Sequence, residues 1–233
     1  MHIVITRPKE DSLHLTRRLK ELGHIVTYLP VVKVKKLETE KINFLNYNAV
    51  IFTSANAIKF LNVDKFNLKI KCYCVGKATE LMAKQAGFIN THSSEGTVDS
   101  LIELIIRMSE AKSGKLLYLS SEFISKDLDI DLMNVGFSVD RISNYTTIPV
   151  EEIDKETLNF LKKKSPDVIF IYSSKSANNL FNLINKYSLL NVVTHSNLMC
   201  ISEKVFLVLK QIKWKKVFIF SPGEEEFLLN KIR

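Results

Sequence analysis

The chain contains CVGKATELMAKQAGF at residues 74–88 and CISEKVFLVLKQIKW at residues 200–214. The two segments align without gaps at a shift of 200 − 74 = 126, with Cys, Leu, Lys and Gln at identical places. Upstream of each lies an apolar run that ends in hydroxyl residues, IFTS at residues 51–54 and IYSS at residues 171–174. Each copy has the pattern of a strand, a Ser/Thr turn, a helix, a second strand, a turn and a helix. The repeat therefore predicts two similar domains.

A weaker match relates LKELG at residues 19–23 to LMNVG at residues 132–136, each ahead of an extended segment. The first of these precedes the repeated block, whereas the second follows it. The simplest explanation is that the chain starts one domain, crosses to the other, completes it and returns. The alternative is that the regular alternation of an α/β fold produces such self-similarity by chance.

The two crossings are predicted at residues 30–36 and 144–151, which are extended in character and contain proline. We therefore expect a discontinuous first domain formed by residues 1–33 and 149–233. The second domain is expected to comprise residues 37–143, and the two crossings are expected to form a two-stranded β linker.

Strand-like runs alternate with helical patterns from end to end, which is typical of parallel sheets flanked by helices. Val, Ile, Phe and Tyr dominate the runs, as buried strands require. The predicted strands are residues 3–6, 25–29, 49–53, 71–75, 116–119, 138–142, 168–172, 197–201 and 217–220. Three helical stripes are expected to face the core: Leu15, Leu19 and Leu22; Leu101, Leu104, Ile105 and Met108; and Leu128, Leu132 and Val135. The predicted fold class is α/β.

The 233 residues carry a formal net charge of +8, which favours an anionic partner such as nucleic acid, phosphate or a polycarboxylate. A solvated surface is the simpler interpretation of the lysine clusters at residues 33–36, 162–164 and 213–216. No apolar run is long enough to span a bilayer, and the sequence begins directly with a strand. We therefore expect a cytoplasmic protein with no membrane partner.

The three cysteines, Cys72, Cys74 and Cys200, each lie in an apolar, strand-like run and are expected to be buried, reduced thiols. A zinc site would need a second Cys or His pair at comparable spacing, and the five histidines are scattered. The sequence also lacks glycine-rich nucleotide-binding patterns, a nucleophile elbow and a zinc helix. The residues by themselves therefore give no support to a zinc, dinucleotide or P-loop site.

Five polar segments directly follow predicted strands, where open α/β sheets bind ligands through loops and helix N-termini. They are Thr53 and Ser54, residues 75–79, Ser120 and Ser121, Ser173 and Ser174, and Ile201 and Ser202. Ser and Thr at such places are also ordinary helix caps, so a purely structural role is open for each. Taken together, five such turns from two domains would line a cleft of N–H and O–H donors suited to a ligand with several carboxylates.

Several segments together resemble the uroporphyrinogen-III synthase family. The matching pieces, in the family's order, are ITRP at residues 5–8, Gly23 followed by LP at 29–30, IFTSANA at 51–57, VGKAT at 75–79, Tyr145 and YSS at 172–174. The resemblance implies two similar α/β domains, the first discontinuous, and a reaction without cofactor. In that reaction hydroxymethylbilane loses its hydroxyl as water and closes to uroporphyrinogen III, with ring D inverted through a spiro intermediate.

The resemblance implies that Tyr145 hydrogen-bonds the leaving hydroxyl, and a structural tyrosine on a β linker is the competing interpretation. The substrate-binding candidates, from the resemblance and the polar turns, are Arg7, Thr53, Ser54, Gly76, Lys77, Thr79, Ser120, Ser173, Ser174 and Ser202. The chain departs from the family at residues 201–205, ISEKV, where a Gly-x-Thr-x-x-Ala turn is common. Ser202 could supply the hydroxyl there, but Glu203 would repel a carboxylate unless Lys204 offsets it.

Two other functions are compatible with the sequence. A two-lobed small-anion binding protein without catalysis would also have paired α/β domains and two crossings. A nucleic-acid-binding module has only the net charge in its favour. The leading hypothesis predicts a monomer that takes a small-molecule substrate, with hydroxymethylbilane synthase as a candidate partner and no nucleic acid.

Overall fold

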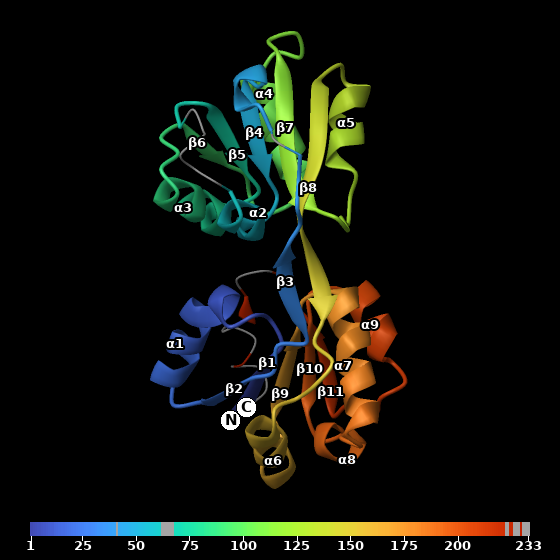
Figure 1. The fold of residues 1–233 in the computed structure, drawn as a ribbon. Helices are drawn as coiled ribbons and strands as arrows, with labels where there is room; N and C mark the ends of the chain where they lie inside the picture. The colour runs from blue at the N-terminus through green and yellow to red at the C-terminus, as the bar shows by residue number, and fades with distance from the viewer. Residues whose placement is uncertain (41, 62–67, 222–223, 226–228, 230–233) are drawn as a thin grey trace. The chain divides into compact units, whose positions relative to one another are not determined.

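A computed structural model describes residues 1–40, 42–61, 68–221, 224–225 and 229. Contacts divide the chain into two compact units. Unit 1 consists of Met1–Lys33 and Ile148–Arg233, and unit 2 consists of Val34–Thr147. Two strands, β3 (Val32–Lys36) and β8 (Ser138–Pro149), carry the chain across the boundary and are neighbours in one sheet (Figure 1). The predicted linker is therefore a pair of strands.

Unit 1 contains a sheet with the strand order β11-β10-β9-β1-β2, in which every neighbouring pair is parallel. Its strands are β1 (His2–Ile5), β2 (Ile25–Tyr28), β9 (Val168–Ile171), β10 (Asn197–Cys200) and β11 (Lys216–Ile219). Its helices are η1 (Glu10–Ser12), α1 (Leu13–Glu21), α6 (Lys155–Lys163), α7 (Ser174–Lys186), α8 (Leu190–Val193) and α9 (Glu203–Leu209). The three central strands, β1, β9 and β10, are buried along their whole length, which explains their continuous apolar runs.

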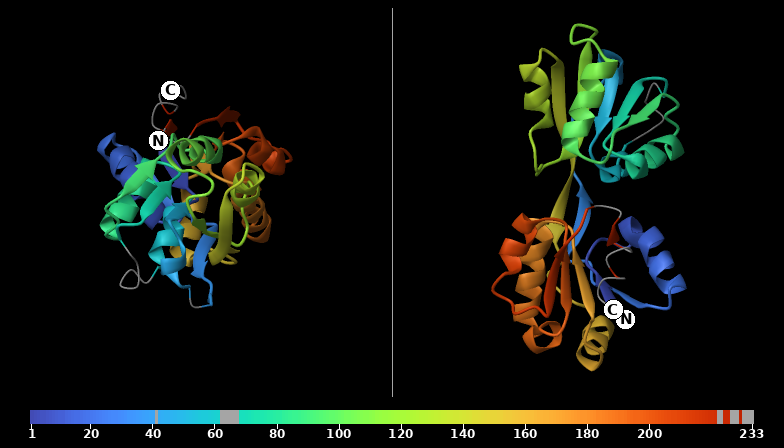
Figure 2. Two further views of the ribbon diagram at one scale, coloured as in Figure 1. Left: turned by 90° about the horizontal axis from the view of Figure 1, so that it is seen from above. Right: turned by 180° about the vertical axis from the view of Figure 1, so that it is seen from behind.

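Alternate residues of these strands enter two cores, as the period of a strand requires. Val4 and Ile169 pack with α6, α7 and α9 on one face, and Figure 2 shows the orange helix of this layer from behind. Ile3 and Phe170 pack with Leu19 of α1 on the other face. Both faces of the unit 1 sheet are therefore covered.

Unit 2 contains a sheet with the order β3-β8-β7-β4-β5-β6, and the pairs from β8 to β6 are parallel. Its further strands are β4 (Ala49–Phe52), β5 (Lys71–Cys74), β6 (Thr91–Ser93) and β7 (Lys115–Ser121). Its helices are η2 (Phe44–Asn46), α2 (Ala55–Lys59), α3 (Lys77–Gln85), α4 (Val98–Met108) and α5 (Leu128–Asn134). Helices α2 and α3 cover one face, and α4 and α5 cover the other.

The two sheets have matching strand orders, which explains the internal repeat. β4 and β5 lie next to each other in unit 2 as β9 and β10 do in unit 1. The strands on their other sides also correspond, β7 and β8 in unit 2 with β1 and β2 in unit 1. Leu19 and Leu132, from the weaker sequence match, are both fully buried, and Gly23 and Gly136 both end their helices with positive φ. The domains are thus similar but entered by the chain at different points.

The structure corrects several details of the sequence analysis. β6 was not predicted, because Thr91–Ser93 is short and polar, and β8 continues beyond residue 142 to Pro149. The stripes are wrong at their last positions, since Leu22, Met108 and Val135 are 44%, 36% and 51% exposed. Leu22 and Val135 stand where the helix has ended and the chain turns towards a glycine, so the helical period no longer applies. Met108 is the last residue of α4.

Candidate functional site

A pocket of about 190 Å³ lies at the carboxyl-end edge of the unit 2 sheet, where β4 and β7 end. Its walls come from the turn after β4, the loop after β7, two residues of β7, and one residue each of α4 and β8. The lining residues are Thr53, Ser54, Val98, Tyr118, Ser121, Phe123, Ile124, Ser125, Lys126 and Tyr145. Hydroxyl groups and aromatic rings dominate this set, so the pocket offers hydrogen bonds beside apolar surfaces.

The turn after β4 contributes Thr53 and Ser54. Ser54 is the N-cap of α2, and its hydroxyl oxygen accepts a hydrogen bond of 3.2 Å from the backbone N–H of Asn56. Thr53 Oγ1 and the Tyr118 hydroxyl share a hydrogen bond of 3.1 Å. The turn therefore holds Thr53 against β7.

Tyr118 is almost fully buried, and burial raises the pKa of its phenol. The hydrogen bond from Thr53 and the positive charge of Arg141 partly offset this effect on the pKa. Tyr118 is accordingly a neutral hydroxyl at ordinary pH, able to donate or accept a hydrogen bond at the pocket wall.

Tyr145 enters the pocket because β8 contains a bulge. Ser143 pairs with Ser120 of β7, but the next pair along joins Tyr145 to Ser121, so Asn144 is an extra residue in β8. Tyr145 packs with the α2 and α3 core and is 6% exposed. Its carbonyl oxygen accepts a hydrogen bond of 2.9 Å from the backbone N–H of Glu122. The backbone of β8 and the start of the loop after β7 are thereby joined.

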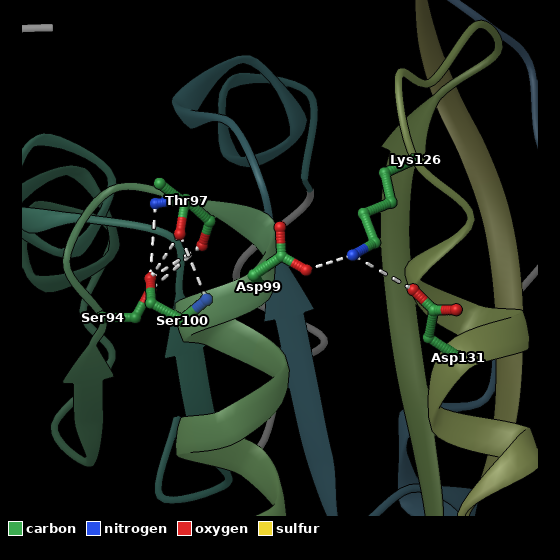
Figure 3. Close-up of polar contacts among 6 residues, drawn as sticks. All are labelled: Ser94, Thr97, Asp99, Ser100, Lys126 and Asp131. Carbon is green, nitrogen blue, oxygen red and sulfur yellow. Dashed lines mark hydrogen bonds and ion pairs between the residues drawn. The ribbon is translucent and has the colours of Figure 1, made fainter. Parts of the chain in front are cut away.

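The loop between β7 and α5 forms the outer wall of the pocket. Arg141 fixes its start, because the guanidinium donates to the Ser121 and Glu122 carbonyl oxygens at 3.1 and 3.0 Å. Lys126 fixes its other end through Asp99 of α4 and, at 3.5 Å, through Asp131 of α5 (Figure 3). The hydrogen bond to Asp99 raises the pKa of Lys126.

The residues predicted around α3 lie outside this pocket's lining. Gly76 is the N-cap of α3, and a Cβ built on it would stand 3.3 Å from the Gly96 Cα, so the glycine allows close backbone contact. Lys77 forms an ion pair of 3.0 Å with Glu80. Thr79 is 6% exposed within α3. In this structure these residues make structural contacts within unit 2.

Ser120 was predicted to lie in a turn, and this prediction is wrong because β7 continues to Ser121. The side chain of Ser120 is buried, and its Oγ accepts a hydrogen bond of 3.0 Å from Arg141 Nε while donating to the Ser121 carbonyl at 2.9 Å. Ser121 is the member of this pair that lines the pocket. The predicted turn is two residues too early, because the loop begins at residue 122.

In unit 1 the predicted serines stand at helix starts. Ser173 is the N-cap of α7 and accepts a hydrogen bond of 3.0 Å from the Ser176 backbone N–H. Ser174 is the first residue of α7, and its carbonyl accepts from Asn178 at 3.0 Å. Ser202 is the N-cap of α9 and accepts from the Val205 N–H at 3.4 Å. Ser173 and Ser202 thus have the helix-capping role that the sequence left open.

Arg7 follows β1 and lies over the ring of Tyr172, with its Cζ 4.5 Å from the ring centroid. Burial, together with the negative charge of Glu225, raises the pKa of the Tyr172 phenol. Such a stacked guanidinium keeps its N–H groups in one plane, a geometry that suits carboxylate recognition.

The structure therefore brings Thr53, Ser54 and Tyr145 together in one pocket. It also adds Tyr118, Phe123 and other lining residues that sequence reasoning missed. Tyr118 lies inside a strand and has the pattern of a core residue, so no sequence signal separates it from its neighbours. The loop was detectable only as the segment that follows Ser121.

Among the described residues, no group of three or more His, Cys, Asp or Glu is placed to hold a metal ion. The three cysteines are buried and free. No helix in the part of the chain described here is long and apolar enough to cross a membrane.

Comparison with known proteins identifies the family. A family model for uroporphyrinogen-III synthase HemD matches residues 14–224, which is most of the chain. The chain belongs to the uroporphyrinogen-III synthase family. Within the family, the porphyrin biosynthesis protein HemD of Ruminiclostridium josui is 26% identical over 164 residues, or 64% of this chain. That alignment covers 32% of the Ruminiclostridium protein, so the chain spans about a third of the length of this relative.

Solved uroporphyrinogen-III synthases have the same fold. The Helicobacter pylori protein matches with a TM-score of 0.64 and 16% identity, over 100% of this chain and 99% of that one. A mutant of the Thermus thermophilus protein matches with a TM-score of 0.53 and 14% identity, over 99% of this chain and 97% of that one. At these identities the likeness concerns the fold alone.

Proposed function

We propose that this chain is a uroporphyrinogen-III synthase, a cyclising lyase of tetrapyrrole and haem biosynthesis. It closes hydroxymethylbilane to uroporphyrinogen III with loss of water and inversion of ring D. The observation that supports this most directly is the unit 2 pocket, in which Tyr145 stands with Thr53 and Ser54. Family membership over residues 14–224 supports the same activity.

In this proposal Tyr145 donates a hydrogen bond to the hydroxyl of the substrate. The carbon–oxygen bond of the hydroxymethyl group breaks, and the hydroxyl leaves as water together with the proton that the N–H of the same pyrrole ring gives up. The resulting azafulvene is attacked by the substituted carbon of ring D, and the spiro intermediate rearranges to the product. Thr53, Ser54 and Tyr118 supply further hydrogen-bonding groups around the reacting end of the substrate.

The carboxylates of the substrate are proposed to meet amides, hydroxyls and positive charge. Arg7, Ser173, Ser174 and Ser202 are the proposed binding groups of unit 1, and Gly76 offers the N-terminal amides of α3 in unit 2. The net charge of +8 supports attraction of a polycarboxylate. Lys77, Thr79 and Ser120 have less support, because Lys77 and Ser120 are engaged within unit 2 and Thr79 is buried.

Catalysis in this proposal depends mainly on proximity and orientation, because the free substrate also cyclises unaided to the symmetric type I isomer. The proposed compartment is the cytoplasm, which the three buried, free cysteines support. No described residue group suggests a resident metal, and the proposal uses no cofactor.

The experiment is to supply freshly made hydroxymethylbilane to the purified protein, oxidise the products and separate the type I and type III isomers by chromatography. An excess of type III without added cofactor is expected. Type I alone from well-folded protein would overturn the proposal and favour a small-anion binding protein. Heat-unfolded protein at the same concentration provides the control for unaided cyclisation.

A further inference from the structure

Asn144 is the extra residue of the bulge in β8, a position that no sequence pattern predicts. Ile142 packs on the face of the sheet covered by α2 and α3, so a regular strand would direct residue 144, and not 145, to that face. The extra residue changes the alternation, and Tyr145 packs on the α2 face as well. Bulges occur next to active sites, where they redirect a side chain.

Asn144 is held on both its backbone and its side chain. Its Nδ2 donates a hydrogen bond of 2.7 Å to the carbonyl oxygen of Ala57, in the middle of α2. Its own carbonyl accepts a hydrogen bond of 3.0 Å from the Leu37 backbone N–H. The residue is 5% exposed, so little water competes for these bonds.

The Asn144 side-chain hydrogen bond joins α2, which follows the turn that lines the pocket, to β8, which supplies Tyr145. Helix α2 starts directly after Thr53 and Ser54, and Asn144 immediately precedes Tyr145 in β8. A link from residue 144 to the middle of α2 therefore sets the position of the Tyr145 phenol relative to the turn after β4. Ser54 Oγ is fixed to the same helix by its capping bond to Asn56.

The other side-chain atom of Asn144 argues against a role in stability alone. Asn144 Oδ1 is buried and has no hydrogen-bond partner among the described residues. A buried acceptor without a partner is destabilising, so an apolar residue would serve a purely structural position better. The functional part of the Asn144 side chain is therefore Nδ2, which donates to the Ala57 carbonyl oxygen.

We propose that Asn144 is a positioning residue, which holds Tyr145 in line with Thr53 and Ser54 by tying the β8 bulge to α2. This inference rests on the proposed function for its catalytic consequence. Its structural part, that Asn144 sets the environment of the Tyr145 phenol, can be tested without any turnover.

The kinetic test compares Asn144→Ala and Asn144→Asp with the unmodified protein in the isomer assay. Aspartate has the shape of asparagine but places an acceptor opposite the Ala57 carbonyl. We expect kcat to fall about 10- to 100-fold with KM changed less than about threefold, because displaced reacting groups lose orientation. The share of type I product should rise, since unaided cyclisation then competes.

Ile105→Val is the matched control, because Ile105 is a buried residue of α4 in the same unit, belongs to the core on the other face of the sheet from Tyr145 and does not line the pocket. It weakens unit 2 by removing one buried methyl group, without touching the bulge. If kcat and isomer ratio in the Asn144 variants change no more than in Ile105→Val, the positioning role is overturned. Asn144→Ser, a smaller polar replacement, serves where Asn144→Ala does not fold.

The second readout uses protein labelled with ¹³C at the ζ carbon of tyrosine. The Tyr145 resonance is assigned by its loss in Tyr145→Phe. We expect it to shift in Asn144→Asp and to stay in place in Ile105→Val, and an unchanged resonance in Asn144→Asp would refute the proposal. If the unmodified protein makes no type III isomer, the proposed function fails, but this spectrum still decides whether Asn144 positions Tyr145.

Discussion

Replacing Glu80 by glutamine tests whether the charge of one enclosed carboxylate stabilises unit 2. Its oxygens accept hydrogen bonds from the Thr91 and Ser93 hydroxyls at 3.1 and 2.7 Å, which join α3 to β6. They also form ion pairs with Lys84 at 2.9 Å and Lys77 at 3.0 Å. Glutamine keeps the shape and can still accept a hydrogen bond, so the change removes mainly the charge.

The expected loss follows from the pKa. The hydrogen bond from Lys84, followed by those from Ser93 and Lys77, lowers the pKa of Glu80 from 4.5 to about 2. A difference of about 2.5 pH units corresponds to about 3.4 kcal/mol, at about 1.36 kcal/mol per unit. The Glu80 side chain is 9% exposed, but Lys77 and Lys84 are 86% and 56% exposed, so water screens both pairs. We therefore expect Glu80→Gln to cost about 2 kcal/mol at pH 7.

The contribution of the Glu80 charge to stability depends on pH with a definite sign. Because the pKa is lower in the folded protein, the carboxylate stabilises it fully above the unfolded value of 4.5. This contribution is lost as the pH falls from 4.5 towards 2, so the difference between Glu80→Gln and the unmodified protein should shrink. At about pH 3 it should be less than half of its value at pH 7.

The assay is hydrogen exchange by mass spectrometry on peptides covering α3 and β6, at both pH values. Unit 2 needs such a local probe, because the one tryptophan of the sequence, Trp214, belongs to unit 1. Glu103→Gln is the matched control, since Glu103 is an exposed residue of α4. Equal protection in Glu80→Gln and Glu103→Gln at pH 7, or a difference that grows on acidification, would refute the reasoning.

Three further outcomes are expected. Tyr145→Phe should slow formation of the type III isomer without abolishing it, because orientation carries most of the catalysis; complete loss in a folded variant would contradict this. Ser173→Ala should lower the free energy of unfolding of unit 1 by about 1 kcal/mol, and Ser173→Gly by less, as measured by urea unfolding followed by Trp214 fluorescence. Gly76→Ala should lower the free energy of unfolding by about 1 kcal/mol, and with it the midpoint of thermal unfolding, because the added Cβ would press on the Gly96 backbone. An unchanged midpoint would argue against that contact.

The sequence was sufficient for the architecture because the evidence for it is periodic. Cys74 and Cys200 end the equivalent strands β5 and β10, as the repeat predicts. The match between Leu19 and Leu132 marked equivalent helices that come before the repeated block in one unit and after it in the other. Regularly spaced buried positions produce a pattern of apolar residues that extends over many residues and can be read from the sequence.

The pocket was only partly predictable, because its geometry depends on single residues. The bulge at Asn144 changes the face of Tyr145 without altering the alternation of residue types around it. Tyr118 of β7 shares a hydrogen bond with Thr53 in the turn after β4, and no local sequence pattern indicates this contact. The turn predicted at Ser120 was two residues early, because β7 continues to Ser121 and only then enters the loop.

The different entry points of the chain into its two units have a consequence for biosynthesis. Residues 34–147 leave the ribosome as one uninterrupted segment, so every strand of the unit 2 sheet, except the end of β8 beyond residue 147, is present before the rest of unit 1 is made. β1 must wait for its partner β9, which begins at Val168, and Ile3 and Ile5 lack their core until then. Unit 1, to which β1 belongs, is thus the last to close. A nascent chain stalled between the two units should carry a folded unit 2 and an exposed apolar N-terminal strand, the kind of surface that chaperones bind.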